Sequence, residues 1–560
     1  MISSPKFDVA IIGSGIAGSS LGAILARHGL KVAIFEAKSH PRFAIGESMI
    51  LETSEMMRSM AEIYSVPELA YFSSENYFSY IGTSHGVKRH FSYLHHEVNQ
   101  PQNPNRLLQA VIPKQPYGHE LHLYRQDSDY FLMTTAIRYG AEAFQNTKVR
   151  NVEINNLGVE LITESGDLYQ ADYIVDAGGF HSLLAEKFNL RTDNLQTHSR
   201  AIFTHMVNVP CYQQTEASVN FDAPFCLSEG TLHHVFEGGW LWVIPFNNHD
   251  RATNPLCSVG LMLDPRIHPV REDLSPEAEF YAFIARFPSL KSQLCSAKAV
   301  RGWTRTNRIQ YSSNQIVGDR FCLLGHAAGF IDPLFSKGLY TSLSSVSLLA
   351  NLLLEANKTK DYSAAQFQPL EDITLAFIKS NDRLIANAYK TFSYYPLWSL
   401  YSILWLLGAY CELLKLTTMR SDTANRADYY QQLSNLKLVG GSFTEFEALQ
   451  EQIYTILDNT NFKNKAECNC AAEKITSLYS QLKWMPHAFQ QILKGKKHLP
   501  ASKIRPRIFK GQGGFLGIGS YRQHFFSNHN LGSLVKLFIK EKAKYSAIAL
   551  NLQKKGFLSS

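Results

Sequence analysis

The chain has 560 residues, of which 45% are hydrophobic, 12% aromatic and 18% charged. This composition excludes an intrinsically disordered or fibrous protein and indicates a globular chain of roughly two to four domains. The formal net charge is +7, but residues 494–560 contain fourteen lysines and arginines against one acid, so residues 1–493 carry a net charge of −6. A basic end of this kind either attracts an acidic partner or is simply a solvated surface.

The N-terminus predicts a cytoplasmic protein, because MISSPKFDV leads directly into an apolar run without the pattern of a secretory signal. The eight cysteines are scattered through the chain. Their one tight pair, Cys468 and Cys470, has neither a second pair nor histidines at metal-binding spacing. We therefore expect reduced, structural thiols and no metal site.

A β-α-β unit is predicted at the start of the chain. Residues 7–13 (FDVAIIG) form an apolar run typical of a buried parallel strand, residues 19–30 have helical spacing, and residues 31–36 form a second apolar run. Residues 172–180 and 316–330 each indicate a strand that enters a turn of glycine and alanine. We expect a nucleotide-binding domain assembled from these discontinuous pieces.

The loop of this unit carries a G-x-G-x-x-G fingerprint between strand and helix. The glycines allow a tight turn, a close approach of the backbone to a pyrophosphate, and close packing of the helix on the strand. A carboxylate at the end of the second strand suits the ribose hydroxyls of a dinucleotide. The predicted binding residues are Gly13, Ser14, Gly15, Ile16, Ala17, Gly18 and Glu36.

The remaining chain divides by pattern into a sheet and a helical region. Residues 199–263 contain strand-like runs such as THMVNV and WLWVIPF, whereas the pattern from about residue 340 onward is helical. We predict an α/β protein in which an inserted β-sheet domain holds the substrate and a helical C-terminal region follows. The predicted domains are residues 1–198 with 300–350 for nucleotide binding, 199–299 for the sheet, and 351–560 for the helices.

One long uncharged stretch, between Lys390 and Glu412, contains 21 residues with several aromatic rings. Its length is sufficient for a transmembrane span. Pro396, several hydroxyl groups and the aromatic rings favour a packed lid or dimer helix instead, with membrane contact as the less favoured alternative.

Four segments resemble the FAD-contacting segments of the flavoprotein monooxygenase-like superfamily. They are HPRFAIGES (40–48), LYRQDSDYF (123–131), the DAGG turn and GDRFCLLGHAAG (318–329). The resemblance implies FAD as the cofactor and adds contacts from Arg42, Gly46, Glu47, Ser48, Arg125, Asp176, Ala177, Gly178, Gly325 and His326. His326 stands where the superfamily usually has an aspartate that contacts the ribityl chain.

Two further patterns resemble the signatures of flavin-dependent halogenases. W-x-W-x-I-P begins at Trp240, and alternation along a strand places Trp240 and Trp242 on one face. F-x-x-P-x-x-S-x-G runs from Phe330 and includes Ser336 and Gly338; in relatives the backbone amides after this serine bind halide. Phe335, before the serine, resembles the phenol, pyrrole and alkyl-type members rather than the tryptophan halogenases.

In that family reduced FAD, supplied by a separate flavin reductase, reacts with oxygen and halide to give hypohalous acid, which travels to a lysine beside the substrate. The family position of this lysine falls on or beside Glu75, and no lysine occurs between Lys38 and Lys88. The catalytic alternatives are Lys88 in a shifted register, Lys337 beside the halide turn, halogenation without a lysine, or a relative that has lost halogenation.

The first functional hypothesis is therefore an FAD-dependent halogenase that acts on an electron-rich small molecule, free or tethered to a carrier protein. Its alternative is a monooxygenase, desaturase or reductase of the same fold that lacks halogenation and acts on a substrate such as a lipid. No nucleic-acid partner is expected, and a non-catalytic FAD-binding scaffold is the weakest hypothesis.

Overall fold

The computed structural model describes residues 5–73, 76–112, 119–215, 223–423, 425–486, 489, 519–530, 532–537 and 539–543. Glu75 and most of the basic segment after residue 493 lie outside the described residues. The predictions made for them therefore stay predictions.

The first sheet is the predicted nucleotide-binding sheet. Its strands lie in the order β19-β20-β10-β1-β2-β7, and β8 and β9 extend it from β10. β1 pairs in parallel with both β10 and β2, as a Rossmann-like unit requires. The bounds are β1 Lys6–Ile12, β2 Val32–Phe35, β7 Glu142–Phe144, β8 Val149–Asn155, β9 Gly158–Thr163, β10 Leu168–Asp176, β19 Val317–Gly318 and β20 Phe321–Leu323.

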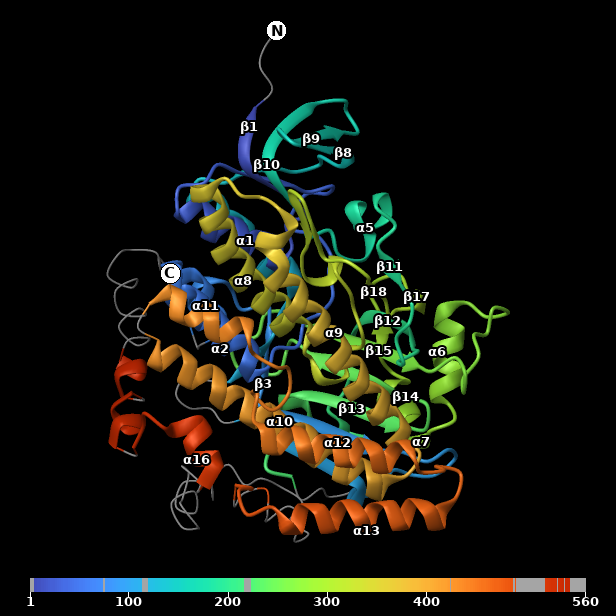
Figure 1. The fold of residues 1–560 in the computed structure, drawn as a ribbon. Helices are drawn as coiled ribbons and strands as arrows, with labels where there is room; N and C mark the ends of the chain where they lie inside the picture. The colour runs from blue at the N-terminus through green and yellow to red at the C-terminus, as the bar shows by residue number, and fades with distance from the viewer. Residues whose placement is uncertain are drawn as a thin grey trace.

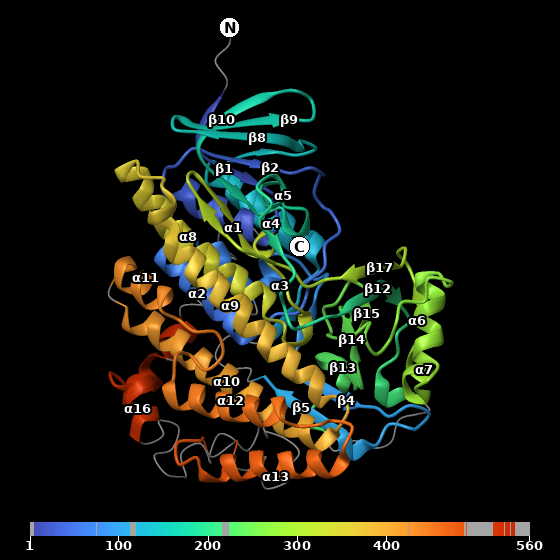
Figure 2. The ribbon, with the colours of Figure 1, turned by 45° about the vertical axis from the view of Figure 1, so that its right-hand side comes forward.

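Helices pack beside this sheet and connect it to the rest of the chain. α1 (Ile16–Arg27) packs against α4 (Arg125–Arg138) and against α8 (Gly338–Thr359), and α8 packs against α9 (Ala364–Thr391). α8 and α9 lie side by side in both views, with the first sheet at the top and the second sheet below and to the right (Figures 1 and 2).

The second sheet has the order β16-β12-β15-β14-β13-β4-β5, with β17 also paired to β12. It therefore takes strands from residues 90–111 and 304–308 as well as from the predicted interval 199–299. A separate pair, β3 (Gly86–Lys88) with β6 (Glu120–His122), adjoins it. The bounds are β4 His90–His95, β5 Leu107–Val111, β12 Arg200–Val207, β13 Thr231–Phe236, β14 Gly239–Pro245, β15 Cys257–Leu263, β16 Lys298–Ala299 and β17 Thr304–Arg308.

Alternation along β14 gives this sheet two different faces. Trp240 and Trp242 belong to the main core, whereas Leu241 and Val243 pack in a second core together with side chains of α6 (Pro276–Ile284) and α7 (Pro288–Leu294). The predicted placement of both tryptophans on one face is confirmed, because their ring centroids are 5.7 Å apart. This face belongs to a core shared with the first sheet and the helices.

The C-terminal region is helical, as predicted, and its helices α10, α12 and α13 form the lowest layer in Figures 1 and 2. Two helices among the described residues, α8 and α10, are long and apolar enough to cross a membrane, but 83% and 67% of their apolar windows are buried inside the protein. The uncharged stretch lies in α10, which packs against α2, α9 and α13. The bounds are α2 Leu51–Ile63, α10 Tyr395–Asp422, α11 Arg426–Ser434, α12 Thr444–Asp458, α13 Lys465–Gln481 and α16 Gly519–Phe526.

The packing of Trp242 on β15 generates a stability prediction. A β-carbon on Gly260 would lie 2.0 Å from the indole of Trp242, so Gly260→Ala forces the tryptophan out of its position. We expect a loss of about 1–3 kcal/mol in the free energy of unfolding, measured as a lower melting temperature by circular dichroism. Gly302→Ala is the matched control, because its β-carbon meets no atom within 4 Å. Equal melting temperatures for the two variants would contradict the tight fit.

Candidate functional site

The glycine loop has the geometry of a pyrophosphate cradle. Gly13 has a φ of +95°, and a β-carbon there would lie 2.6 Å from the carbonyl oxygen of Ala177. A β-carbon on Gly18 would lie 2.1 Å from the Gly13 oxygen. Gly15 precedes the first residue of α1, Ile16, so the amides of the helix start face the loop. Only glycine fits at Gly13 and Gly18.

Glu36, at the end of β2, is held by the same loop. Its carboxylate accepts hydrogen bonds from the Ser14 hydroxyl at 2.8 Å and the Ser14 amide at 3.2 Å, and it pairs with Arg42 at 3.0 Å. Burial opposes ionisation of Glu36, but Arg42 and Ser14 outweigh it and lower the pKa of this carboxyl. Glu36 is therefore a carboxylate that accepts donors, as a ribose site requires.

The predicted segments 40–48 and 123–131 meet beside this loop. Arg125, the first residue of α4, donates to the carbonyl oxygens of Ile45 at 2.5 Å and Gly46 at 3.2 Å, and pairs with Asp129. Glu47 accepts a hydrogen bond from His205 of the second sheet at 2.8 Å. The segment therefore joins the two sheets.

The DAGG turn lies across from the glycine loop. Asp176 is buried, and its carboxylate accepts from the Gly178 amide, the Ser182 hydroxyl and the Leu184 amide at 2.7–2.9 Å. This side chain therefore shapes the turn, while the backbone of Ala177 and Gly178 faces Gly13.

His326 lies at the N-terminus of α8. Its Nε2 would be 3.0 Å from a β-carbon on Gly338, and this buried nitrogen has no hydrogen-bond partner within the described residues. Burial, assisted by Arg125, lowers the pKa of His326 to about 4, so the imidazole is neutral at pH 7. Ser336 has a φ of +56° and closes the turn before the helix. The first amides of α8 and the neutral imidazole together suit an anion or a flavin atom.

These residues fit FAD. The cradle admits a pyrophosphate, and Glu36 suits the ribose. The Nε atom of Arg42 and the Nε2 atom of His326 are buried without partners among the described residues. Gly325, which has a φ of +58°, packs against Ala17 of α1 and Ser342 of α8, so the two helix starts meet where the cofactor would run.

A hydrogen-bonded series joins the two halogenase-like motifs. Trp240 Nε1 donates to the Tyr389 hydroxyl at 3.1 Å, and Tyr389 donates to Asp332 at 2.9 Å. Asp332 belongs to the segment FIDPLFSKG and also accepts from the Ser199 hydroxyl at 2.8 Å and the Leu334 amide at 3.0 Å. The orientation of the tryptophan face therefore depends on the turn that begins α8.

Lys88 is a fully buried amine next to Gly46, Glu47 and Ser48, which we call the GES segment. Its Nζ donates to Ser48 Oγ at 2.7 Å and to the Met49 carbonyl oxygen at 2.9 Å, and lies 3.4 Å from the centroid of Phe91. Burial lowers the pKa of Lys88 well below its usual value, and Glu120 and Glu52 only partly oppose this effect. The amine therefore loses its proton far more readily than an exposed lysine.

A chain of hydroxyl groups continues from Ser48. Its Oγ lies 3.1 Å from Thr231 Oγ1, which lies 2.9 Å from His122 Nε2, and His122 Nδ1 lies 2.9 Å from the Pro245 carbonyl oxygen. That carbonyl can only accept, so Nδ1 carries the hydrogen and Nε2 accepts from Thr231. Burial lowers the pKa of His122 to about 3, which keeps it neutral. Thr231 therefore accepts from Ser48, and Ser48 Oγ is left as an acceptor for Lys88.

Aromatic rings connect this amine to the tryptophan face. The ring of Phe91 stacks with His233 at 6.0 Å, His233 contacts Trp240 at 5.5 Å, and Trp240 contacts Trp242. All four rings come from neighbouring strands of the second sheet. Lys88 and the W-x-W motif therefore border one apolar region.

Lys337 has a different environment. Its Nζ bonds to Glu52 of α2 at 2.8 Å and to Glu412 of α10 at 2.6 Å. Burial opposes its charge, but Glu412 and Glu52 outweigh this effect and raise the pKa of Lys337. A buried ammonium held by two carboxylates ties α2, α8 and α10 together, and its removal would leave uncompensated buried charge.

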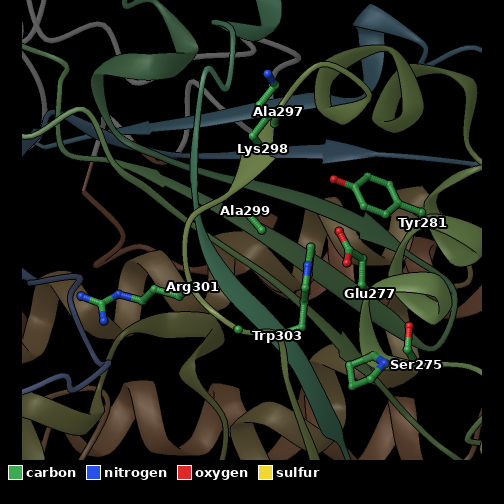
Figure 3. Close-up of a pocket in the computed structure, with 10 residues that line it drawn as sticks. Ser275, Glu277, Tyr281, Ala297, Lys298, Ala299, Arg301 and Trp303 are labelled. Carbon is green, nitrogen blue, oxygen red and sulfur yellow. The ribbon is translucent and has the colours of Figure 1, made fainter.

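A separate hollow of 620 Å³ lies by the start of α6 and the strand β16 (Figure 3). None of the predicted site residues lines it. Arg301 points away from the other labelled side chains of the hollow, and its guanidinium lies 4.6 Å above the ring of Phe43.

Comparisons with known proteins agree with these motifs. A family model described as tryptophan halogenase matches residues 76–391, and one described as an NAD(P)-binding Rossmann-like domain matches residues 11–47. Tetracycline 7-halogenase of Kitasatospora aureofaciens is 42% identical over 71% of this chain and 72% of its own length. Monodechloroaminopyrrolnitrin halogenase PrnC of Pseudomonas fluorescens is 44% identical over 72% of this chain and 71% of its own length.

The chain belongs to the flavin-dependent halogenases. The structure of halogenase PltM in complex with phloroglucinol and FAD has a TM-score of 0.83 and 34% identity, covering 88% of this chain and 99% of that one. The predicted fold class, FAD cofactor, halide co-substrate and halogenase activity are confirmed. The alternative of a relative that has lost halogenation is not favoured.

Residue roles inside this halogenase stay predictions, but the structure separates the candidates. Lys88 contacts the GES segment and Lys337 is sequestered between carboxylates, whereas Glu75 lies outside the described residues. Sequence reasoning missed Thr231, His122 and Asp332. Asp332 lies inside the F-x-x-P-x-x-S-x-G motif, so the sequence could have indicated it. His122 and Thr231 belong to no motif whose spacing predicts a functional role.

Asp332 generates a pH prediction. Burial raises the pKa of this carboxyl from 3.8 to about 6, so its contribution to stability is complete below pH 3.8 and is lost as pH rises through about 6. Relative to Asp332→Asn, the wild type should lose about 3 kcal/mol of unfolding free energy over this interval. Melting temperatures of both proteins from pH 4 to pH 7.5 measure the effect, and parallel curves would exclude it.

Proposed function

We propose that this FAD-dependent halogenase acts on a small, electron-rich aromatic molecule, with Lys88 as the amine that delivers the halogen. The observation that carries the proposal is the position of Lys88 Nζ, hydrogen-bonded to Ser48 of the GES segment and seated over Phe91 at one end of the aromatic series that includes Trp240. Among the two lysines considered, Lys88 alone is not neutralised by an ion pair with a carboxylate.

Bound FAD, once reduced, supplies the electrons with which oxygen and halide yield hypohalous acid. The protein must then hold a nucleophilic nitrogen away from water. Ser48 Oγ and the Met49 carbonyl oxygen each need an N–H from Lys88, so a neutral amine keeps both hydrogen bonds. The proton to be lost is the one over Phe91, because a ring face is a weaker acceptor than oxygen. The lone pair is then directed to the apolar side of the site.

The substrate class follows from the apolar aromatic face and from the relatives. Trp240 and Trp242 form an apolar aromatic wall that suits a planar aromatic substrate. The relatives at 42–44% identity are named for tetracycline and monodechloroaminopyrrolnitrin, and PltM was solved with phloroglucinol. The relative named for a carrier-bound pyrrole, from Pseudomonas fluorescens, is only 26% identical. We therefore favour a free small molecule over a carrier-tethered one.

We also propose that a separate flavin reductase supplies the reduced FAD. The described residues contain one Rossmann-like nucleotide-binding sheet with one G-x-G-x-x-G loop, which FAD would occupy. A second dinucleotide therefore has no corresponding unit within the part of the chain that the structure describes.

Lys88→Met tests the assignment, because methionine preserves an unbranched side chain and removes the amine. With reduced FAD, oxygen, bromide and phloroglucinol, we expect the brominated product to fall at least about 100-fold, while oxygen consumption by bound FAD continues. Product is measured by mass spectrometry, and oxygen by electrode. Lys148→Met, at a lysine whose side chain is 61% exposed, is the matched control. Full bromination by Lys88→Met would refute the role of this amine.

Thr231→Val tests the hydroxyl chain without changing the shape of the side chain. In this variant the Ser48 hydroxyl loses Thr231 as its acceptor and can point its hydrogen at Lys88 Nζ. That hydrogen bond occupies the lone pair of the amine, which then reacts less readily with hypohalous acid. Loss of one such hydrogen bond should lower the rate of bromination about 2- to 10-fold. FAD affinity, followed by flavin fluorescence, should stay unchanged. Thr231→Ser should restore the rate, and Thr253→Val, at an exposed threonine, should not alter it. An unaltered rate in Thr231→Val would show that the chain does not control the amine.

A further inference from the structure

Two cysteines outside the halogenation chemistry lie side by side. Cys211 Sγ and Cys226 Sγ are 2.9 Å apart, both residues are partly exposed, and both thiols are free. A disulfide brings its sulfur atoms to about 2.05 Å, so bond formation requires a movement of less than about 1 Å. The pair is therefore preorganised for a covalent link.

The two sulfur atoms differ in chemical character. The contact between the two sulfur atoms, assisted by Ser228, lowers the pKa of Cys226, and the same contact raises the pKa of Cys211. Gln213 Oε1 lies 3.0 Å from Cys211 Sγ and accepts from the Leu227 amide at 3.1 Å, which holds the two turns together. The direction of these shifts favours Cys226 as the thiol that ionises and attacks first, with Cys211 as the thiol that resolves its oxidation product.

The turn that carries Cys226 is attached to the strand segment that carries Lys88. The Cys226 carbonyl oxygen accepts from His90 Nε2 at 2.9 Å. In the same turn Glu229 pairs with Arg89 at 2.6 Å, and its carbonyl oxygen accepts from the Arg89 amide at 2.8 Å. Arg89 and His90 directly follow Lys88. The cysteine pair is therefore held against the strand segment that carries the amine.

We propose that Cys211 and Cys226 form a redox site that consumes hypohalous acid and closes to a disulfide. The Cys226 thiolate attacks the halogen, an S–halogen bond forms, and the O–halogen bond breaks to release hydroxide. Cys211 then attacks Cys226, the S–S bond forms, and halide leaves while the Cys211 proton converts hydroxide to water. The two sulfur atoms lose two electrons and the halogen gains two. The source of the oxidant rests on the proposed function, whereas the thiol chemistry does not.

The first experiment tests the thiol site without turnover. The full-length protein receives one equivalent of hypobromite, and its peptides are mapped by mass spectrometry without reduction. We expect a Cys211–Cys226 disulfide and the loss of two free thiols, reversed by dithiothreitol. Cys295 and Cys470, which are exposed, should stay reduced at this dose and serve as internal controls. Earlier oxidation of these two, or oxidation of Cys226 without a link to Cys211, would overturn the proposal.

Variants and turnover separate this site from the proposed function. Cys226→Ser should slow the loss of thiols about tenfold, whereas Cys295→Ser should not change it. During turnover with reduced FAD and oxygen, the disulfide should form with bromide and not without halide. If the disulfide forms with added hypobromite but not during turnover with bromide, the thiol site is supported. The inference that the enzyme itself supplies the oxidant is then refuted. A Cys226→Ser protein that loses thiols at the wild-type rate would overturn the site itself.

Discussion

Burying the Nζ of Lys88 removes it from water, and the protein compensates with two oxygen atoms at 2.7 and 2.9 Å. They belong to Ser48, the last residue of the GES segment, and to Met49, which follows it. The GES segment also contacts Arg125 of α4 and reaches the second sheet through Glu47. A buried amine without such partners would cost several kcal/mol. The amine proposed to deliver the halogen and the residues predicted to contact FAD are therefore held by one segment of chain.

A second constraint lies at the start of α8, where Asp332, His326 and Lys337 each contact a different part of the protein. Asp332 holds the turn and, through Tyr389, the tryptophan face, while His326 lies against Gly338. Lys337, between them, turns its side chain away into two carboxylates of α2 and α10. Helices α2 and α10 thus help to hold in place the short turn that is predicted to bind halide.

The proposed role of Lys88 rests on contacts that sequence spacing does not encode. Counting from the GES segment places the family lysine at Glu75, because spacing treats the intervening chain as uniform. Two compact turns, Pro67–Ser73 and Tyr77–Tyr80, lie in this interval, and β3 then returns the chain to Ser48. The register of β3 with β6 decides which side chain faces the site, and no local pattern encodes that register.

The sequence by itself determined the nucleotide-binding unit, the cofactor and the family, because their signals are local: Gly13 and Gly18 admit no side chain, and W-x-W alternates within one strand. Only the tertiary structure gave Lys88 and Lys337 different environments, and only it brought Thr231 to His122 and Cys211 to Cys226. These decisions depend on burial and on pairs of residues far apart in the chain. Such contacts form when sheets and helices pack, so their energies are absent from any single segment.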